Sequence, residues 1–109
     1  MNKVILMGRL VKDVELRYSQ SDEPIAIGRY TLAVTRFYKR KGEPDADFIN
    51  IVAFGKAAEF AEKYFKKGQK VCVVGRLQVR NYENDEGKKQ FFTEVIVDEQ
   101  YFAEGKKDS

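Results

Sequence analysis

Apolar and polar residues alternate along most of this chain with a period of two, which is typical of β-strands that bury one face. The clearest example runs from Val71 to Tyr82. Its odd positions are mainly apolar, and the even positions of its second half are Arg76, Gln78, Arg80 and Tyr82. We therefore expect Leu77 and Val79 to share the core face with Val71 and Val73. The opposite face would present two guanidiniums and an aromatic ring in one row.

Other segments have strand-like patterns as well. Val4–Leu10 is an apolar run in which Gly8 suggests a bulge or bend, and Asp13–Tyr18 alternates in the manner of a half-exposed strand. Further strands are predicted over 25–38, 47–54 and 91–97, with a short extension at 101–102. Polar loops or turns with Gly or Pro separate them at 19–24, 39–46 and 84–87.

One segment has helical spacing. Between Lys56 and Lys67, apolar residues recur three or four positions apart, and Gly68 follows as the expected stop residue. Lys66 and Lys67 would then lie in the last turn, where the helix dipole favours cations.

This order of elements predicts an all-β fold. Strands joined by long hairpin loops, with one helix between the third and fourth long strands, are typical of a five-stranded Greek-key barrel of the OB type. We expect one such domain over residues 1–103 and a short charged tail at 104–109.

Composition narrows the chemistry. The chain contains no histidine and a single cysteine, Cys72, so it lacks the residues of imidazole or thiolate zinc sites and of most acid–base catalysis. We expect no enzyme activity, no cofactor and no metal. Cys72 suits a packed side chain in a reducing cytosol, and no apolar run is long enough for a membrane span. The net charge of +3 permits an anionic partner without requiring one.

Aromatic residues stand beside cations in two places. Thr35–Lys41 interleaves Phe37 and Tyr38 with four cations, and the strand described first ends in Arg80-Asn81-Tyr82. Phe48 and Phe54 add two rings on one face of a neighbouring strand, with a polar asparagine between them. Cations for phosphates and flat rings for bases are the two requirements of single-stranded nucleic-acid binding.

Two questions stay open at this level. Solvated basic loops and ordinary half-exposed strands would produce the same clusters without any ligand. Tyr38 is also an even number of residues away from Leu32, so a regular strand would turn both side chains to the same face. Either the strand bends or Phe37 is the exposed ring.

Several blocks resemble the bacterial single-stranded DNA-binding (SSB) family, in the right order and over nearly the whole chain. The blocks are residues 2–10 (NKVILMGRL), 13–18 (DVELRY), 31–34 (TLAV), 47–50 (DFIN), 54–59 (FGKAAE), 66–68 (KKG), 75–78 (GRLQ) and 93–95 (TEV). The resemblance implies an OB-fold, a homotetramer and single-stranded DNA wrapped around the outside.

Site residues follow from the resemblance motif by motif. The stacking rings fall on Tyr38, Phe48, Phe54 and Tyr82, and the matching basic positions are Lys56, Lys67 and Arg80. Arg36 and Arg76 are added from the strand-face argument above. The expected function is sequence-tolerant binding and protection of single-stranded DNA during replication, recombination and repair, in the cytoplasm at the nucleoid.

The sequence also bears on protein partners, on self-association and on alternative functions. Members of the family carry a flexible linker and an acidic tip that recruits replication and repair proteins; the printed sequence has no such motif after residue 104. The apolar first strand predicts self-association through its edge. The alternatives are a dimeric primosome-type accessory protein of the same fold, and a protein-interaction barrel whose aromatics form an interface.

Overall fold

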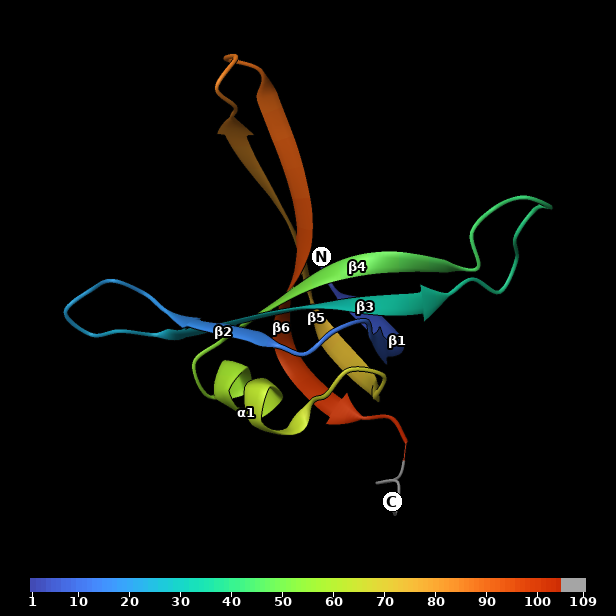
Figure 1. Ribbon diagram of the computed structural model, residues 1–109, viewed down its shortest axis with the longest axis horizontal. Helices are drawn as coiled ribbons and strands as arrows, with labels where there is room; N and C mark the ends of the chain where they lie inside the picture. The colour runs from blue at the N-terminus through green and yellow to red at the C-terminus, as the bar shows by residue number, and fades with distance from the viewer. Residues whose placement is uncertain (105–109) are drawn as a thin grey trace.

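The computed structural model describes residues 1–104 as six strands and one helix. Three loops or hairpins extend from the centre in different directions (Figure 1). In chain order the elements are β1 Val4–Leu10, β2 Glu15–Tyr18, β3 Ala26–Thr35, β4 Ala46–Phe54, α1 Lys56–Tyr64, β5 Lys70–Glu83 and β6 Lys89–Phe102. Residues 105–109 of the predicted tail lie outside the described residues.

Five of these strands close into a ring. The sheet order is β1-β5-β6-β4-β3-β2, and β1 also pairs with β3, at Arg9↔Ala33 and Leu10↔Leu32. The predicted five-stranded OB-type barrel is therefore confirmed, with the helix between the third and fourth strands of the ring. The short strand β2 is additional, and it pairs only with the first half of β3.

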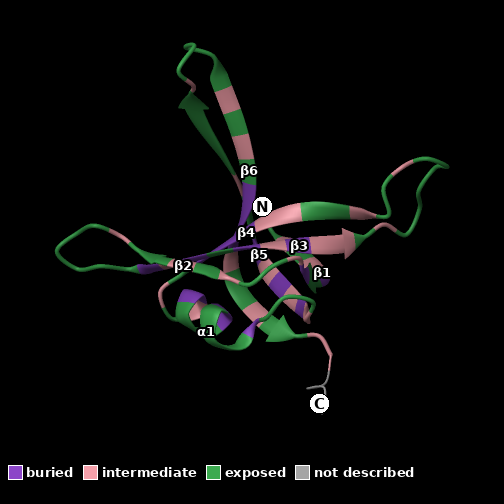
Figure 2. Ribbon diagram, in the orientation of Figure 1, coloured by how far each residue is buried: buried purple, intermediate pink, exposed green. Residues whose placement is uncertain are grey.

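The ring contains one parallel contact, between β4 and β6, at Ile51↔Val95 and Val52↔Ile96. The other pairs are antiparallel. Buried segments gather where these strands cross (Figure 2). The interior consists mainly of apolar side chains from the five ring strands, among them Leu10, Leu32, Ile51, Val71, Val73 and Val95.

Phe65 connects the helix to this core. It is fully buried and packs edge-on against Tyr30, with the ring centroids 6.1 Å apart. Burial raises the pKa of the Tyr30 hydroxyl, which donates a hydrogen bond to Gln100 Oε1 at 2.9 Å. Phe65 thereby fixes the helix against the barrel.

The helix is shorter than the spacing predicted. It ends at Tyr64, because Phe65 takes an extended backbone conformation (φ −92°, ψ 121°) as its ring enters the core. Lys66 and Lys67 consequently follow the helix, so their expected place in its last turn was wrong. Gly68 adopts a positive φ of 86° within the turn that leads to β5.

Beyond Gly75, β5 and β6 leave the barrel as a two-stranded arm, which projects upward in Figure 1. Leu77 and Val79 belong to this arm and are exposed, so their predicted place in the core was wrong. The side chains of β5 alternate between its two faces as expected, but within residues 1–104 no second layer covers the inner face of the arm. β6 is also one continuous strand from Lys89 to Phe102, where a strand and a separate extension were expected.

Two glycines allow the strands to approach closely enough for closure. A Cβ atom on Gly75 would lie 2.1 Å from the carbonyl oxygen of Ile96, and one on Gly8 would lie 2.5 Å from that of Ala33. Any side chain at either place would force the strands apart. Gly8 is thus explained by the contact between β1 and β3.

The position of Phe65 yields a stability prediction. Phe65→Ala should lower the free energy of unfolding by about 3–5 kcal/mol, because it empties a fully buried ring site. Phe37→Ala is the matched control, since its ring is almost wholly exposed and its removal should change stability by less than about 0.5 kcal/mol. Urea unfolding at one protein concentration measures both, and equal losses would contradict this account of the core.

Candidate nucleic-acid interface

The four predicted stacking rings all reach solvent. Tyr38 is 94% exposed, Phe48 66%, Phe54 47% and Tyr82 55%. Apolar rings of this size are rarely left bare without a reason when they occur as a group. Their exposure makes them accessible to an extended polymer.

Strand register joins three of these rings to the basic row of β5. Phe48 and Phe54 share the face of β4 that also carries Val52. Val52 neighbours Ile96 of β6, and the antiparallel partner of Ile96 on β5 is Arg76. Since cross-strand neighbours share a face, the β4 rings and the β5 row form one continuous surface. We call it the aromatic face, and its β5 members are Arg76, Arg80 and Tyr82.

Tyr38 lies outside that register. β3 ends at Thr35, so the alternation that would turn Tyr38 toward the face of Leu32 stops three residues earlier. Phe37 and Tyr38 are both almost fully exposed in the loop between β3 and β4. Tyr38 is therefore not turned to the face of Leu32, and either ring of this loop is available for stacking.

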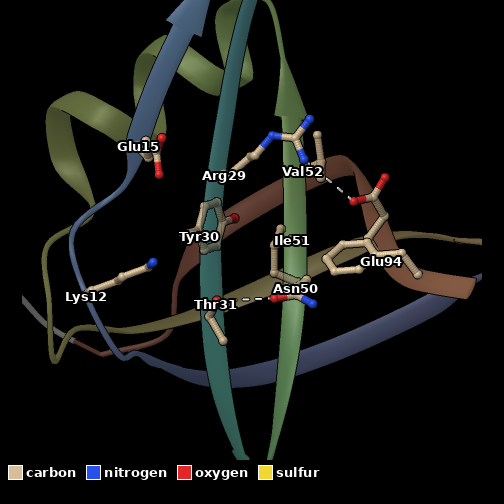
Figure 3. A pocket seen from close by; sticks show the side chains of 10 residues that line it. Lys12, Glu15, Arg29, Tyr30, Thr31, Asn50, Ile51, Val52 and Glu94 are labelled. Atoms are coloured by element: carbon tan, nitrogen blue, oxygen red, sulfur yellow. Dashed lines mark hydrogen bonds and ion pairs between the residues drawn. The ribbon is translucent and has the colours of Figure 1, made fainter. Parts of the chain in front are cut away.

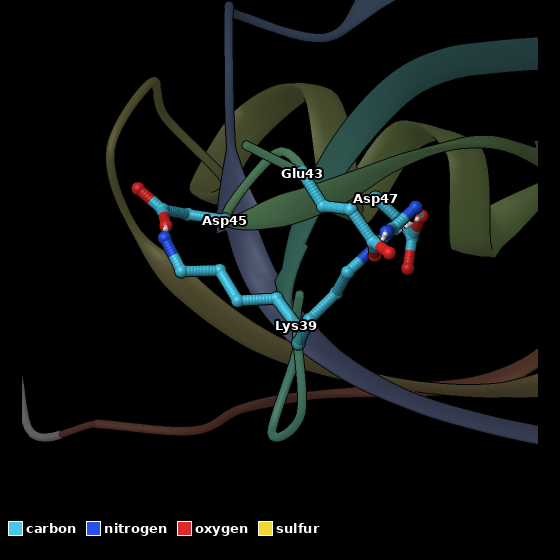
Figure 4. Close-up of polar contacts among 5 residues, drawn as sticks. Lys39, Glu43, Asp45 and Asp47 are labelled. Carbon is cyan, nitrogen blue, oxygen red and sulfur yellow. Dashed lines mark hydrogen bonds and ion pairs between the residues drawn. The ribbon is translucent and has the colours of Figure 1, made fainter. Parts of the chain in front are cut away.

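The β3–β4 loop is held by its own ion pairs (Figure 4). Arg36 bridges two acids: its Nη2 lies 2.6 Å from Asp47 Oδ1 and its Nη1 lies 3.0 Å from Glu43 Oε2. Lys39 pairs with Asp45. The backbone N–H of Arg36 also donates to the Asp45 carbonyl at 2.9 Å. These contacts connect the two sides of the loop that carries Phe37 and Tyr38.

These ion pairs affect how much positive charge Arg36 offers to a ligand. The hydrogen bond from Arg36 lowers the pKa of the Asp47 carboxyl, and the same contact raises the pKa of the guanidinium. Arg36 therefore stays charged, but two carboxylates already offset its charge. The role of Arg36 in DNA binding stays a prediction; its observed contacts join the two sides of the loop.

The other predicted cations are distributed unevenly. Arg76 and Arg80 are exposed on the aromatic face, and Lys56 begins the helix immediately after Phe54 and Gly55. Lys67 is exposed too, but its backbone N–H donates to Asp13 Oδ1 at 2.8 Å, against the turn that follows β1. Its fixed contact is therefore with the β1–β2 turn and not with the aromatic face.

A hollow beside β3 and β4 contains residues that the sequence reasoning missed (Figure 3). Its lining includes Arg29, Phe92 and the buried carboxylate of Glu94. Adjacent strand residues point to opposite faces, so the pair Phe91-Phe92 already implied one ring on each side of β6. An acid among apolar residues of β6, opposite a basic strand, was the sequence clue to Glu94.

Together these observations define a class of protein: an OB-type barrel whose outer surface presents aromatic rings and guanidiniums over a continuous face. A family model described as the single-strand binding protein family matches residues 1–103. The chain belongs to this family.

Curated relatives agree with that assignment. The chain is 50% identical over 107 residues to single-stranded DNA-binding protein 1 of Staphylococcus aureus strain Mu50, covering 97% of this chain and 67% of the relative. It is 48% identical over 98 residues to single-stranded DNA-binding protein 1 of Streptococcus pyogenes serotype M18, covering 89% and 74%. It is 46% identical over 110 residues to single-stranded DNA-binding protein 2 of Listeria monocytogenes, covering 100% and 68%.

The Arg36–Asp47 pair yields a prediction about pH. A carboxyl whose pKa is lower in the folded state stabilises the fold above its ordinary pKa, and this contribution is lost as the pH falls through the lower, folded-state value. Asp47→Asn should therefore lower the unfolding midpoint at neutral pH, and the difference from the unsubstituted protein should shrink at an acidic pH below the folded-state pKa of the carboxyl. Thermal unfolding at both pH values measures this. A difference that persists in acid would show that the ion pair is not its source.

Proposed function

We propose that this protein binds single-stranded DNA with little sequence preference and protects it during replication, recombination and repair. Family membership supports a binding function, and the exposure of Tyr38, Phe48, Phe54 and Tyr82 carries the proposal. Each ring offers a flat apolar surface to an unpaired base, and every base has a face that can stack on it. Duplex DNA keeps its bases stacked internally, so it should bind more weakly.

Phosphates would be held by the cations around these rings. Arg76 and Arg80 lie on the aromatic face, and Lys56 follows Phe54 closely in the chain. Lys67 and Arg36 remain part of the proposed set, with smaller contributions expected because of the positions described above. Binding of phosphates releases counterions, so affinity should fall as salt rises.

The cellular setting is proposed as well. Within residues 1–104, no helix is long and apolar enough to cross a membrane. The relatives are bacterial proteins whose names describe binding to single-stranded DNA. We place the activity at the nucleoid in the cytoplasm, where replication and repair proteins would meet the bound strand.

The stacking role can be tested at Tyr82. Tyr82→Ala should weaken binding to a fluorescein-labelled oligo-dT by roughly 1–3 kcal/mol, measured by anisotropy, because one base loses its platform. Tyr18→Ala is the matched control, because the Tyr18 side chain is 56% exposed against 55% for Tyr82. Tyr18 lies on β2, where its cross-strand partner is Ala26, and β2 is not a neighbour of β5 in the sheet. Equal effects of the two substitutions, or none, would remove Tyr82 from the site.

We further propose that the protein assembles as a homotetramer. Ile5 and Met7 are exposed on alternate positions of β1, which gives this strand an apolar outer side. Leu77, Val79 and Phe91 leave a second apolar surface on the inner side of the arm. Tetramers with two-fold symmetries need more than one self-complementary interface, and these two surfaces could provide them.

Sedimentation tests the assembly. The unsubstituted protein should sediment at micromolar concentration with four times the chain mass of 12.6 kDa. Ile5→Lys should reduce that mass, because it places a charge in the first apolar surface. Ile25→Lys, at an exposed residue of the loop before β3, serves as the control and should leave the mass unchanged. A dimer would favour the primosome-type alternative, and a monomer would exclude self-association through β1.

A further inference from the structure

We propose that Arg29 and Arg80 form a phosphate clamp on the aromatic face and that the buried carboxylate of Glu94 positions both guanidiniums. The inference rests on the proposed binding of single-stranded DNA and deepens it. It adds Arg29 as a phosphate ligand and Glu94 as a positioning residue, although Glu94 carries the charge that a nucleic acid repels.

Glu94 holds the two arginines from different strands. Its side chain is only 3% exposed. Arg80 on β5 places Nε 2.9 Å from Glu94 Oε1, and Arg29 on β3 places Nη1 3.9 Å from Oε2. Figure 3 shows the Arg29 guanidinium above β4, directed toward the Glu94 carboxylate. One carboxylate therefore brings together guanidiniums from two strands that are not neighbours in the sheet.

Arg80 has a further support. Its guanidinium carbon lies 5.4 Å from the centre of the Phe92 ring, which stands on the same strand as Glu94. A cation over an aromatic face is attracted by the ring. The ring and the carboxylate together restrict the orientations that Arg80 can take.

Charge and donors are left over for a ligand. Two guanidiniums share one carboxylate, so the group keeps an excess of one positive charge. Each arginine side chain remains 46% exposed, and a guanidinium has five N–H donors in a fixed planar arrangement. Glu15, which is opposite Arg29 on β2, already pairs with Arg17 at 2.8 Å. A phosphodiester, whose two non-bridging oxygens share one negative charge, fits donors arranged in this way.

The clamp also has the right location. Arg29 is the cross-strand partner of Val52, which lies on the face of β4 between Phe48 and Phe54. Arg80 precedes Tyr82 by two residues on the same face of β5. A strand that stacks on the β4 rings and on Tyr82 would therefore run close to both arginines.

The burial of Glu94 has a physical consequence. A carboxylate removed from water is unfavourable unless it is paired. Glu94 therefore keeps the two arginines close by, and they are oriented before any ligand arrives. Preorganised donors lose less side-chain entropy on binding, which raises affinity.

The sign of one substitution distinguishes positioning from simple electrostatics. Glu94→Gln removes a negative charge beside the DNA path, so electrostatics alone predicts tighter binding. If Glu94 positions the arginines, oligo-dT should instead bind about 5- to 10-fold more weakly, as expected when a buried pair loses its charge. The dependence of log K on log salt should also become shallower by about 0.7 for each phosphate that the arginines no longer bind. Unchanged or tighter binding would overturn the proposal.

Arg29→Gln tests the second ligand and leaves the shorter Arg80–Glu94 ion pair in place. It should make the salt dependence shallower by about 0.7, the value for one single-strand phosphate. Arg9→Gln is the matched control, because Arg9 is similarly exposed (51%) and also pairs with one carboxylate, that of Glu104. It carries the same change in charge and should leave the salt slope as it is. Equal slopes for Arg29→Gln and the unsubstituted protein would refute the clamp.

A double variant and a folding control test whether Glu94 acts through the arginines. In the Arg29→Gln background, Glu94→Gln should have a smaller effect than it has alone, since Glu94 acts through the arginines. Thermal unfolding reports whether each variant folds; if Glu94→Gln does not, the Arg29→Gln and Arg9→Gln pair decides. Failure of the unsubstituted protein to bind oligo-dT would refute the proposed function itself, whereas normal binding with unaffected variants would refute only the clamp.

Discussion

Closure of the strand ring is the constraint on which the rest of the structure depends. β1 must pair with β5 along one side and with the end of β3 on the other, and β5 must pass close to the backbone of β6. Gly8 and Gly75 make these approaches sterically feasible. Closure fixes the order β3-β4-β6-β5, and this order carries Phe48, Phe54 and the basic row of β5 onto one face. The binding surface is thus a product of how the barrel closes.

The same closure determines where charge is stabilised. In the β3–β4 loop, nearby acids pair with Arg36 and Lys39, and the loop carries two further cations, Arg40 and Lys41. On the aromatic face, Arg29 and Arg80 share the single carboxylate of Glu94 and retain positive charge. Rings and positive charge therefore lie side by side, both in the loop and on the aromatic face.

Much of this architecture was readable from the pattern of apolar and polar residues. The strand periods, the single helix and the exposed row of β5 all followed from residue pattern, and the structure confirms the barrel that they predicted. Pattern could not show that Leu77 and Val79 continue past the end of the core, because alternation reports which face a residue occupies and not whether anything covers that face. It also could not foresee Phe65 ending the helix, which is an effect of packing.

The candidate site, like the fold, was predictable from the sequence only in part. The exposed rings were predictable because aromatics beside polar loops have little core to enter, and their number and placement matched a known family. The partners of Arg36, and the convergence of Arg29 and Arg80 on Glu94, join residues far apart in the chain. Such contacts depend on sheet order and register, which a single sequence does not specify.

The arm formed by β5 and β6 gives the surface supports of unequal stiffness. Phe48 and Phe54 stand on β4, which pairs with β3 along its whole length and with β6 near its centre, whereas Tyr82 stands near the tip of a two-stranded ribbon. Isolated ribbons of this kind are only marginally stable and twist more readily than wider sheets. A polynucleotide crossing this surface would meet rigid stacking platforms at the barrel and a compliant one at the tip. A change of shape on binding would then be taken up by the ribbon while the closed barrel keeps its form.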